Sequence, residues 1–81
     1  MDNINFQDNM ELRVFLLAIY KKKDNENIKD IIDMMINAGL FDMKNGKKCL
    51  KDLKKLEYII DDSLSMSGIQ KAKEVELEFK V

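Results

Sequence analysis

The chain of 81 residues contains no histidine, proline or tryptophan, and it has one cysteine and one arginine. Without histidine, zinc sites that combine cysteine with histidine, Ser/His/Asp triads and Cys/His dyads are all excluded. The single cysteine, Cys49, cannot form a disulfide within the chain. We therefore expect a protein that is not an enzyme and that needs no cofactor or metal.

Long apolar runs are also absent. No segment approaches the roughly 20 apolar residues that cross a bilayer, and no basic segment leads into an apolar stretch with a cleavage site. We expect a cytoplasmic protein that makes no membrane contact. Residues 1–81, 46% hydrophobic and 36% charged, have the composition of a single globular domain. The net charge of -1 means that affinity for nucleic acid must come from a local patch.

Apolar residues recur every three or four positions in three segments, which predicts three amphipathic helices. We expect Asp8 to cap the first helix and Asp24 or Asn25 to cap the second. Gly39 is expected to end the second helix in a left-handed conformation. A turn over residues 42–46 would then precede a third helix over about residues 47–57, in which Leu50, Leu53 and Leu56 are buried.

The two ends of the chain follow a different pattern. Residues 1–7 are predicted to form an arm or a short strand. Residues 74–81 alternate strictly between apolar and charged side chains, which predicts a half-buried C-terminal strand. Residues 58–60 are apolar and are its expected partner after a long connection. The resulting sheet, with Val75, Leu77 and Phe79 in it, is predicted to cover the core of the three helices.

The first predicted helix carries apolar residues well beyond one face, because Val14, Leu17 and Ala18 widen its stripe. Two further helices of a chain this short do not cover that much apolar surface. We therefore expect a homodimer that forms through this helix or the terminal segments.

Several short patterns resemble the winged helix-turn-helix superfamily of small bacterial, archaeal and phage regulators. Gly39-Leu40 is followed by Leu50-x-x-Leu53-x-x-Leu56 and by the apolar run 58–60, and residues 64–72 are similar to the L-[ST]-x-x-G-x-x-x-A stretch after the wing. The resemblance covers about residues 8–73. It implies a mainly α fold of the α+β class, in which three helices precede a small β-ribbon called the wing. The turn between helices two and three is longer than usual, and the acidic segment 74–81 is not part of the pattern.

Residues 44–55 contain six lysines and one aspartate. In the resemblance this segment is the recognition helix, which enters the major groove while its lysines contact phosphates. Asn45 and Lys48 would be the base contacts. The spacing alone leaves a second interpretation open, in which the lysines only solvate the outer face of a helix. The candidate DNA-binding residues are Lys44, Asn45, Lys47, Lys48, Lys51, Lys54 and Lys55.

The resemblance therefore implies a small transcriptional regulator or accessory factor that binds duplex DNA as a homodimer through its third helix. The alternative is a winged-helix module that binds a protein partner and no DNA, with helix one and the acidic segment 74–81 as its surfaces. Cys49, between lysines, is expected to be a small buried residue. A redox-responsive thiol is the other interpretation of this position.

Overall fold

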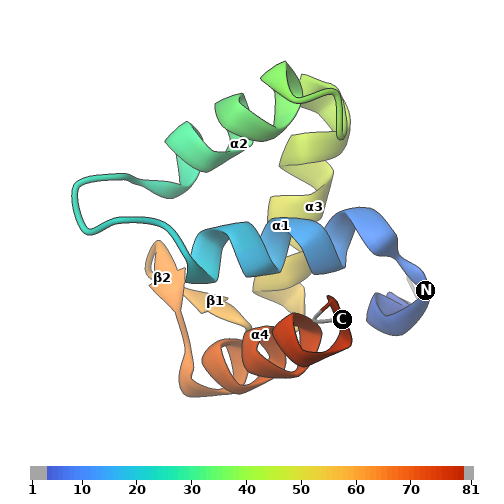
Figure 1. Ribbon diagram of the computed structural model, residues 1–81, viewed down its shortest axis with the longest axis vertical. Coiled ribbons are helices and arrows are strands. Elements are labelled where there is room, and N and C mark those ends of the chain that lie inside the picture. Colours follow the sequence, from blue (N-terminus) through green and yellow to red (C-terminus); the bar gives the residue numbers. More distant parts are fainter. Residues whose placement is uncertain (1–3, 80–81) are drawn as a thin grey trace.

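The computed structural model describes residues 4–79, which form four α-helices, one 3-10 turn and a two-stranded antiparallel sheet (Figure 1). The predicted mainly α fold of the α+β class, with a small β-ribbon, is confirmed at this level. None of the helices in the described part of the chain is long and apolar enough to span a bilayer. In chain order the elements are η1 (Phe6–Asp8), α1 (Met10–Tyr20), α2 (Ile28–Asn37), α3 (Met43–Lys55), β1 (Ile59–Ile60), β2 (Ser63–Leu64) and α4 (Met66–Phe79).

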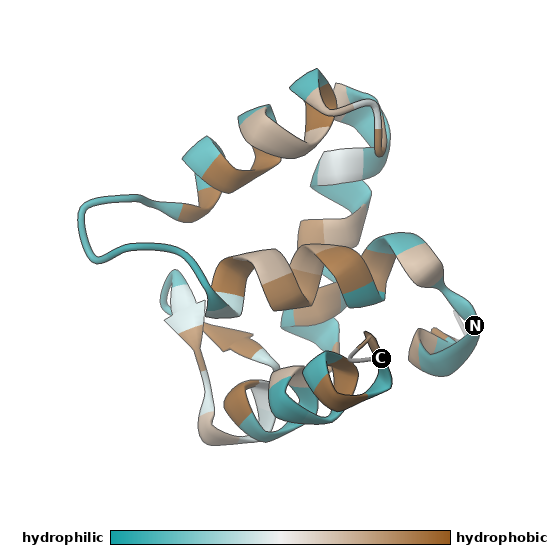
Figure 2. Cartoon of the chain, in the orientation of Figure 1, coloured by the Kyte–Doolittle hydropathy of each residue, from teal (hydrophilic) through white to brown (hydrophobic). Residues whose placement is uncertain are grey.

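Helix α1 lies at the centre of the molecule, between α2 and α4, and α3 packs against it as well (Figure 1). Figure 2 colours most of α1 as hydrophobic, whereas the loop that leads from α1 to α2 is hydrophilic. The three predicted apolar stripes meet in one core, as expected. Its buried apolar residues are Phe6, Leu12, Phe15, Leu16, Ile19, Ile28, Ile31, Ile32, Phe41, Cys49, Leu53, Ile59, Ala72 and Val75.

The helices begin at different residues from those predicted. Asp8 lies in the 3-10 turn, and the α1 cap is Asn9, whose side chain accepts the Leu12 N–H. The α2 cap is Asn27, which forms a reciprocal capping box with Asp30. Asparagine and aspartate are both good caps, so the pattern of residue types does not decide between neighbouring polar positions.

The turn predicted over residues 42–46 is wrong. Asp42 accepts the Asn45 N–H and caps α3, which therefore begins at Met43. Gly46 is buried inside the helix, where an added Cβ would lie 2.8 Å from the Phe41 ring and 3.1 Å from Ile32. This glycine brings α3 close to α2 and is not a turn residue. The prediction for Gly39 is confirmed, because its φ is +81° directly after α2.

The predicted strand over residues 74–81 is also wrong, since residues 66–79 form α4 and residues 80–81 lie outside the described part. Gly68, Ala72 and Val75 recur at helical spacing and are buried. The alternation of the last residues does not correspond to a buried and an exposed side, since Leu77 is 69% exposed. Packing against α1 therefore determines the structure of this segment, and the local alternation of apolar and charged residues does not.

The sheet is a tight hairpin in which β1 pairs with β2, with Ile59 opposite Leu64 and Ile60 opposite Ser63. The long connection expected after residues 58–60 is therefore absent. The two turn residues, Asp61 and Asp62, have φ values of +52° and +63°. Positive φ at both central positions is the geometry of a type I′ turn, which suits the twist of a two-residue hairpin.

The start of α4 is fixed against the start of the hairpin. Ser65 donates its backbone N–H to the Tyr58 carbonyl at 2.9 Å, and its hydroxyl accepts the Gly68 N–H at 3.0 Å. An added Cβ on Gly68 would lie 2.1 Å from the Tyr58 carbonyl oxygen. Only glycine allows this approach of the helix to the strand.

Residues 4–7, the described part of the N-terminal segment, form neither the arm nor the short strand that was predicted for residues 1–7. Phe6–Asp8 form a 3-10 turn, and the buried Phe6 ring packs edge-on against Tyr58 with 5.5 Å between ring centroids. The part of the prediction that concerns residues 1–3 lies outside the described residues.

Candidate nucleic-acid interface

Helix α3 presents all six of its lysines to solvent, and we call them the lysine face. Successive residues of an α-helix are turned by about 100°, so the six lysines fall within an arc of roughly 120°. The buried residues Gly46, Cys49 and Leu53 lie on the opposite side of the helix. The lysine face consists of the exposed residues Lys44, Lys47, Lys48, Lys51, Lys54 and Lys55.

Within the lysine face the side chains form three rows along the helix. Members of a row are seven residues apart, which corresponds to about 10.5 Å along the axis. The central row faces directly away from the core, and the two outer rows flank it on either side. The central row is Lys44 and Lys51, one outer row is Lys47 and Lys54, and the other is Lys48 and Lys55.

Few carboxylates lie close to these lysines. Lys48 Nζ is 3.6 Å from Asp52, the one acidic side chain of α3, which is itself buried. Among residues 4–79, no carboxylate lies within ion-pair distance of Lys44, Lys47, Lys51 or Lys54. Both members of the central row therefore keep their charge available for an external anion.

Asn45 is exposed but does not lie on the lysine face. Helix geometry places it roughly 60° beyond Lys48, on the side of α3 that faces the N-terminus of α1. It lines a small cavity of about 140 Å³ together with Glu11 and Asp52. The structure therefore brings the six candidate lysines together and places the seventh candidate beside two carboxylates.

Cys49 lies on the buried side of α3 and is 6% exposed. Burial, together with smaller contributions from the carboxylates of Glu11 and Asp52, raises the pKa of its thiol to about 11, against an opposite effect of Lys48. A raised pKa suppresses the reactive thiolate. The structure thus supports the interpretation of Cys49 as a core residue.

Comparison of the chain with protein-family models, with curated proteins and with solved structures gave no match. Within residues 4–79, no group of three or more cysteine, aspartate and glutamate side chains is placed to hold a metal ion.

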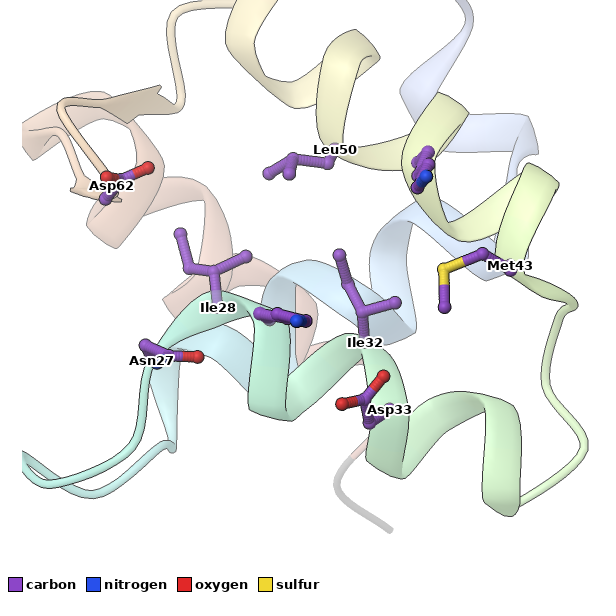
Figure 3. Close-up of a pocket in the computed structure, with 9 residues that line it drawn as sticks. Asn27, Ile28, Ile32, Asp33, Met43, Leu50 and Asp62 are labelled. Carbon is purple, nitrogen blue, oxygen red and sulfur yellow. The ribbon is translucent and has the colours of Figure 1, made fainter.

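A groove of about 580 Å³ lies beside the lysine face, between α2, α3 and the hairpin turn (Figure 3). Ile28 and Ile32 point into it from α2, and Met43 and Leu50 point into it from α3. Its remaining lining residues are polar or charged: Asn27, Lys29, Asp33, Lys47 and Asp62. Sequence reasoning missed this groove because it needs the relative position of three elements, which no local pattern contains.

The turn of the hairpin that follows α3 is acidic. Asp61 and Asp62 are both exposed, and Asp62 lines the same groove as Lys47 of the lysine face. A phosphate that approached α3 from this side would meet two carboxylates. The turn therefore adds negative charge beside the lysine face.

The surfaces that the sequence suggested for a protein partner are used within the chain. Helix α4 covers α1, which accounts for the wide apolar stripe of α1 without a second copy. Glu76 pairs with Lys21 at 2.6 Å. Glu78 pairs with Arg13 and accepts a hydrogen bond from Gln7 at 3.0 Å. Glu74 pairs with Lys71 at 3.6 Å, so all three glutamates of the acidic segment bind the chain's own residues.

Proposed function

We propose that this chain is a winged helix-turn-helix protein, a regulator or accessory factor that binds duplex DNA through the lysine face of α3. The order of elements supports the assignment, because α2 and α3 are joined by residues 38–42 and the hairpin follows α3 directly. The observation that carries the function is the set of four lysines on the exposed side of α3 that have no carboxylate partner among residues 4–79.

The proposed mode of binding follows from the three rows of lysines. The major groove of B-DNA, about 12 Å wide, admits one α-helix. With the central row directed at the groove floor, the two outer rows extend toward the phosphates of opposite strands. Each ammonium that neutralises a phosphate releases condensed counterions, which supplies affinity in a protein of net charge -1.

We also propose a homodimer, but one whose interface is not α1. Met66 and Leu77, 80% and 69% exposed, lie on the outer side of α4 and are the apolar side chains available there. Two protomers would double the number of phosphate contacts. Light scattering over micromolar to millimolar concentrations measures the assembly, and a monomer mass throughout would contradict it.

Fluorescence anisotropy with a labelled duplex tests the proposed function. If three or four lysines of each protomer engage phosphates, log K falls against log salt with a slope of about -3 to -4 for a monomer, or about -5 to -7 for a dimer. Exchange of the central row, Lys44→Glu with Lys51→Glu, is expected to reduce affinity at least about 100-fold at low salt. The fold should persist because neither side chain pairs with a described residue.

The matched control is Lys23→Glu with Lys73→Glu, which changes the net charge by the same amount at exposed positions outside α3. This control is expected to lower affinity only a few-fold through the overall field of the protein. Equal losses in the two double variants would show that α3 has no special role. Failure of the wild-type protein to bind any duplex at low salt would refute the proposed function.

A protein-interaction module is the second candidate, and the groove between α2, α3 and the hairpin turn favours it. The groove combines an apolar floor with charges of both signs at its rim, Lys29 and Lys47 against Asp33 and Asp62. The partner that fits is an amphipathic helix that carries both charges beside its apolar side. Loss of partner binding in Ile32→Glu, with DNA binding absent in the wild type, would support this candidate.

A further inference from the structure

We infer that the lysine face binds the phosphate backbone of duplex DNA without distinguishing base sequence, an inference that rests on the proposed function. It concerns which part of the DNA is recognised. The three observations that support it are the residue types on α3, the position of Asn45 and the charge of the hairpin turn.

The outward arc of α3 contains only lysine. An ammonium on a flexible four-carbon stem is a point charge whose donors rotate freely, so it bonds a phosphate oxygen as readily as a guanine edge. Planar side chains such as those of arginine, asparagine and glutamine hold two bonds to a base in fixed geometry, whereas a lysine that meets a guanine edge has no such constraint. Such planar side chains are absent from the lysine face, which lies entirely within the described residues.

The single arginine of the chain and the amide of α3 are placed elsewhere. Arg13, the single arginine, lies on α1, where its guanidinium pairs with Glu78 and stacks over Phe79 at 5.2 Å. Asn45, the only amide of α3, sits in the small cavity beside Glu11 and Asp52. Neither side chain belongs to the lysine face, so neither is directed at the groove floor together with the central row.

The hairpin turn does not supply a second anchor on the DNA. A wing that fixes the register of a recognition helix must contact the backbone, and here its turn is Asp61 and Asp62. Two carboxylates next to phosphates raise the free energy of the complex. Of α3 and the hairpin, only α3 therefore contacts DNA, and the complex can shift along the duplex at little cost.

A panel of duplexes of equal length tests the inference at one fixed salt concentration. The panel comprises an A·T-only, a G·C-only, an alternating mixed and a randomised duplex. We expect dissociation constants that agree within about threefold, whereas sequence-specific proteins prefer their sites by roughly 10³-fold or more. A preference above about 100-fold for any one duplex would overturn the inference and leave the proposed function intact. No binding to any duplex would instead refute the proposed function.

The hairpin turn gives a second test. Asp61→Asn with Asp62→Gly removes both carboxylates and introduces Asn-Gly, the pair that type I′ turns favour. Affinity is expected to rise about three- to tenfold for all four duplexes alike, and Asp61→Asn alone should give a smaller rise in the same direction. Unchanged or lower affinity, or a new preference among the duplexes, would overturn the inferred role of the turn.

Discussion

Helices α3 and α4 are both rich in charged residues, but their charges have different partners. On α3 the lysines are exposed, and an ion pair within this helix joins Lys48 to Asp52. On α4, Glu78 pairs with Arg13 of α1, and Glu76 pairs with Lys21 at the end of α1. One helix keeps its charge for solvent or an external anion, and the other uses it to hold the fold together.

The difference shows that charge density alone does not identify a binding surface. Both segments are conspicuous in the sequence, and both were candidates for contact with a partner. What separates them is whether opposite charges lie within reach in the folded chain. Variants of α4 should therefore change stability with little effect on DNA affinity per folded molecule, and variants of the lysine face should do the reverse.

The largest expected effect on stability comes from Gly68→Ala. The new Cβ would meet the Tyr58 carbonyl oxygen at 2.1 Å, so α4 must move away from the hairpin and from α1. We expect a loss of about 2–3 kcal/mol in the free energy of unfolding, measured by urea denaturation.

The matched control is Gly39→Ala, because Gly39 has a positive φ but nothing within 4 Å of its added Cβ. Only backbone strain acts there, and we expect a loss of about 1 kcal/mol. If the two variants were equally stable, the close approach of α4 to Tyr58 would not be needed for the fold.

Glu78→Gln tests the ionic contact between α4 and α1. The Arg13 side chain is only 14% exposed, so the neutral amide leaves a largely buried guanidinium without its anion. We expect a loss of about 1–2 kcal/mol, which shrinks as salt screens the wild-type pair. Glu74→Gln, at a more exposed pair with Lys71, should change stability by less than about 0.5 kcal/mol. Equal effects of the two substitutions would contradict a structural role for Glu78.

The buried side of α3 predicts a dependence of stability on pH. The Cys49 thiol has a pKa near 9.0 in the unfolded chain and about 11 in the folded protein. Between these values the unfolded state releases a proton that the folded state retains, so stability falls as pH rises from 9 to 11. The decline at pH 10 attributable to this thiol is about 1 kcal/mol. The urea midpoint of Cys49→Ala should decline less than that of the wild type over the same pH range. Parallel pH profiles of the two proteins would contradict a role of this thiol.

The smallest effect is expected in the hairpin that connects α3 to α4. Asp62 has a φ of +63°, which glycine adopts without the strain of a Cβ. Asp62→Gly should therefore raise the melting temperature slightly, by a gain of about 0.5–1 kcal/mol. Asp24→Gly, in the exposed loop after α1, should give no such gain, and a stabilisation of similar size there would point to a cause other than the turn.

The sequence was sufficient to predict the three N-terminal helices and which side of α3 is buried, although the start of α3 was placed four residues too late. Their apolar positions recur with one period over ten or more residues, and each stripe has a place in a common core. The lysine face follows directly, since a helix that buries Gly46, Cys49 and Leu53 must expose the lysines between them. These features depend on the pattern within a single element.

The features that sequence reasoning missed depend on contacts between elements. Residues 74–79 alternate like a strand, but Ala72 and Val75 pack on α1 only if the segment is helical. The groove, the cavity around Asn45 and the pairing of Glu78 with Arg13 each join residues from different helices. Cap positions were misplaced by one to a few residues because several polar side chains in a row are equally able to cap.

The coverage of α1 by α4 has a consequence for synthesis of the protein. The apolar stripe of α1 ends at Tyr20, whereas its cover, α4, ends at Phe79. At translation rates of about 5–20 residues per second, the synthesis of α1 is complete roughly 3–12 s before that of α4. During this interval its leucine and phenylalanine side chains are available to chaperones or to other nascent chains. The yield of folded protein should therefore depend on how quickly the ribosome completes the segment between the two helices.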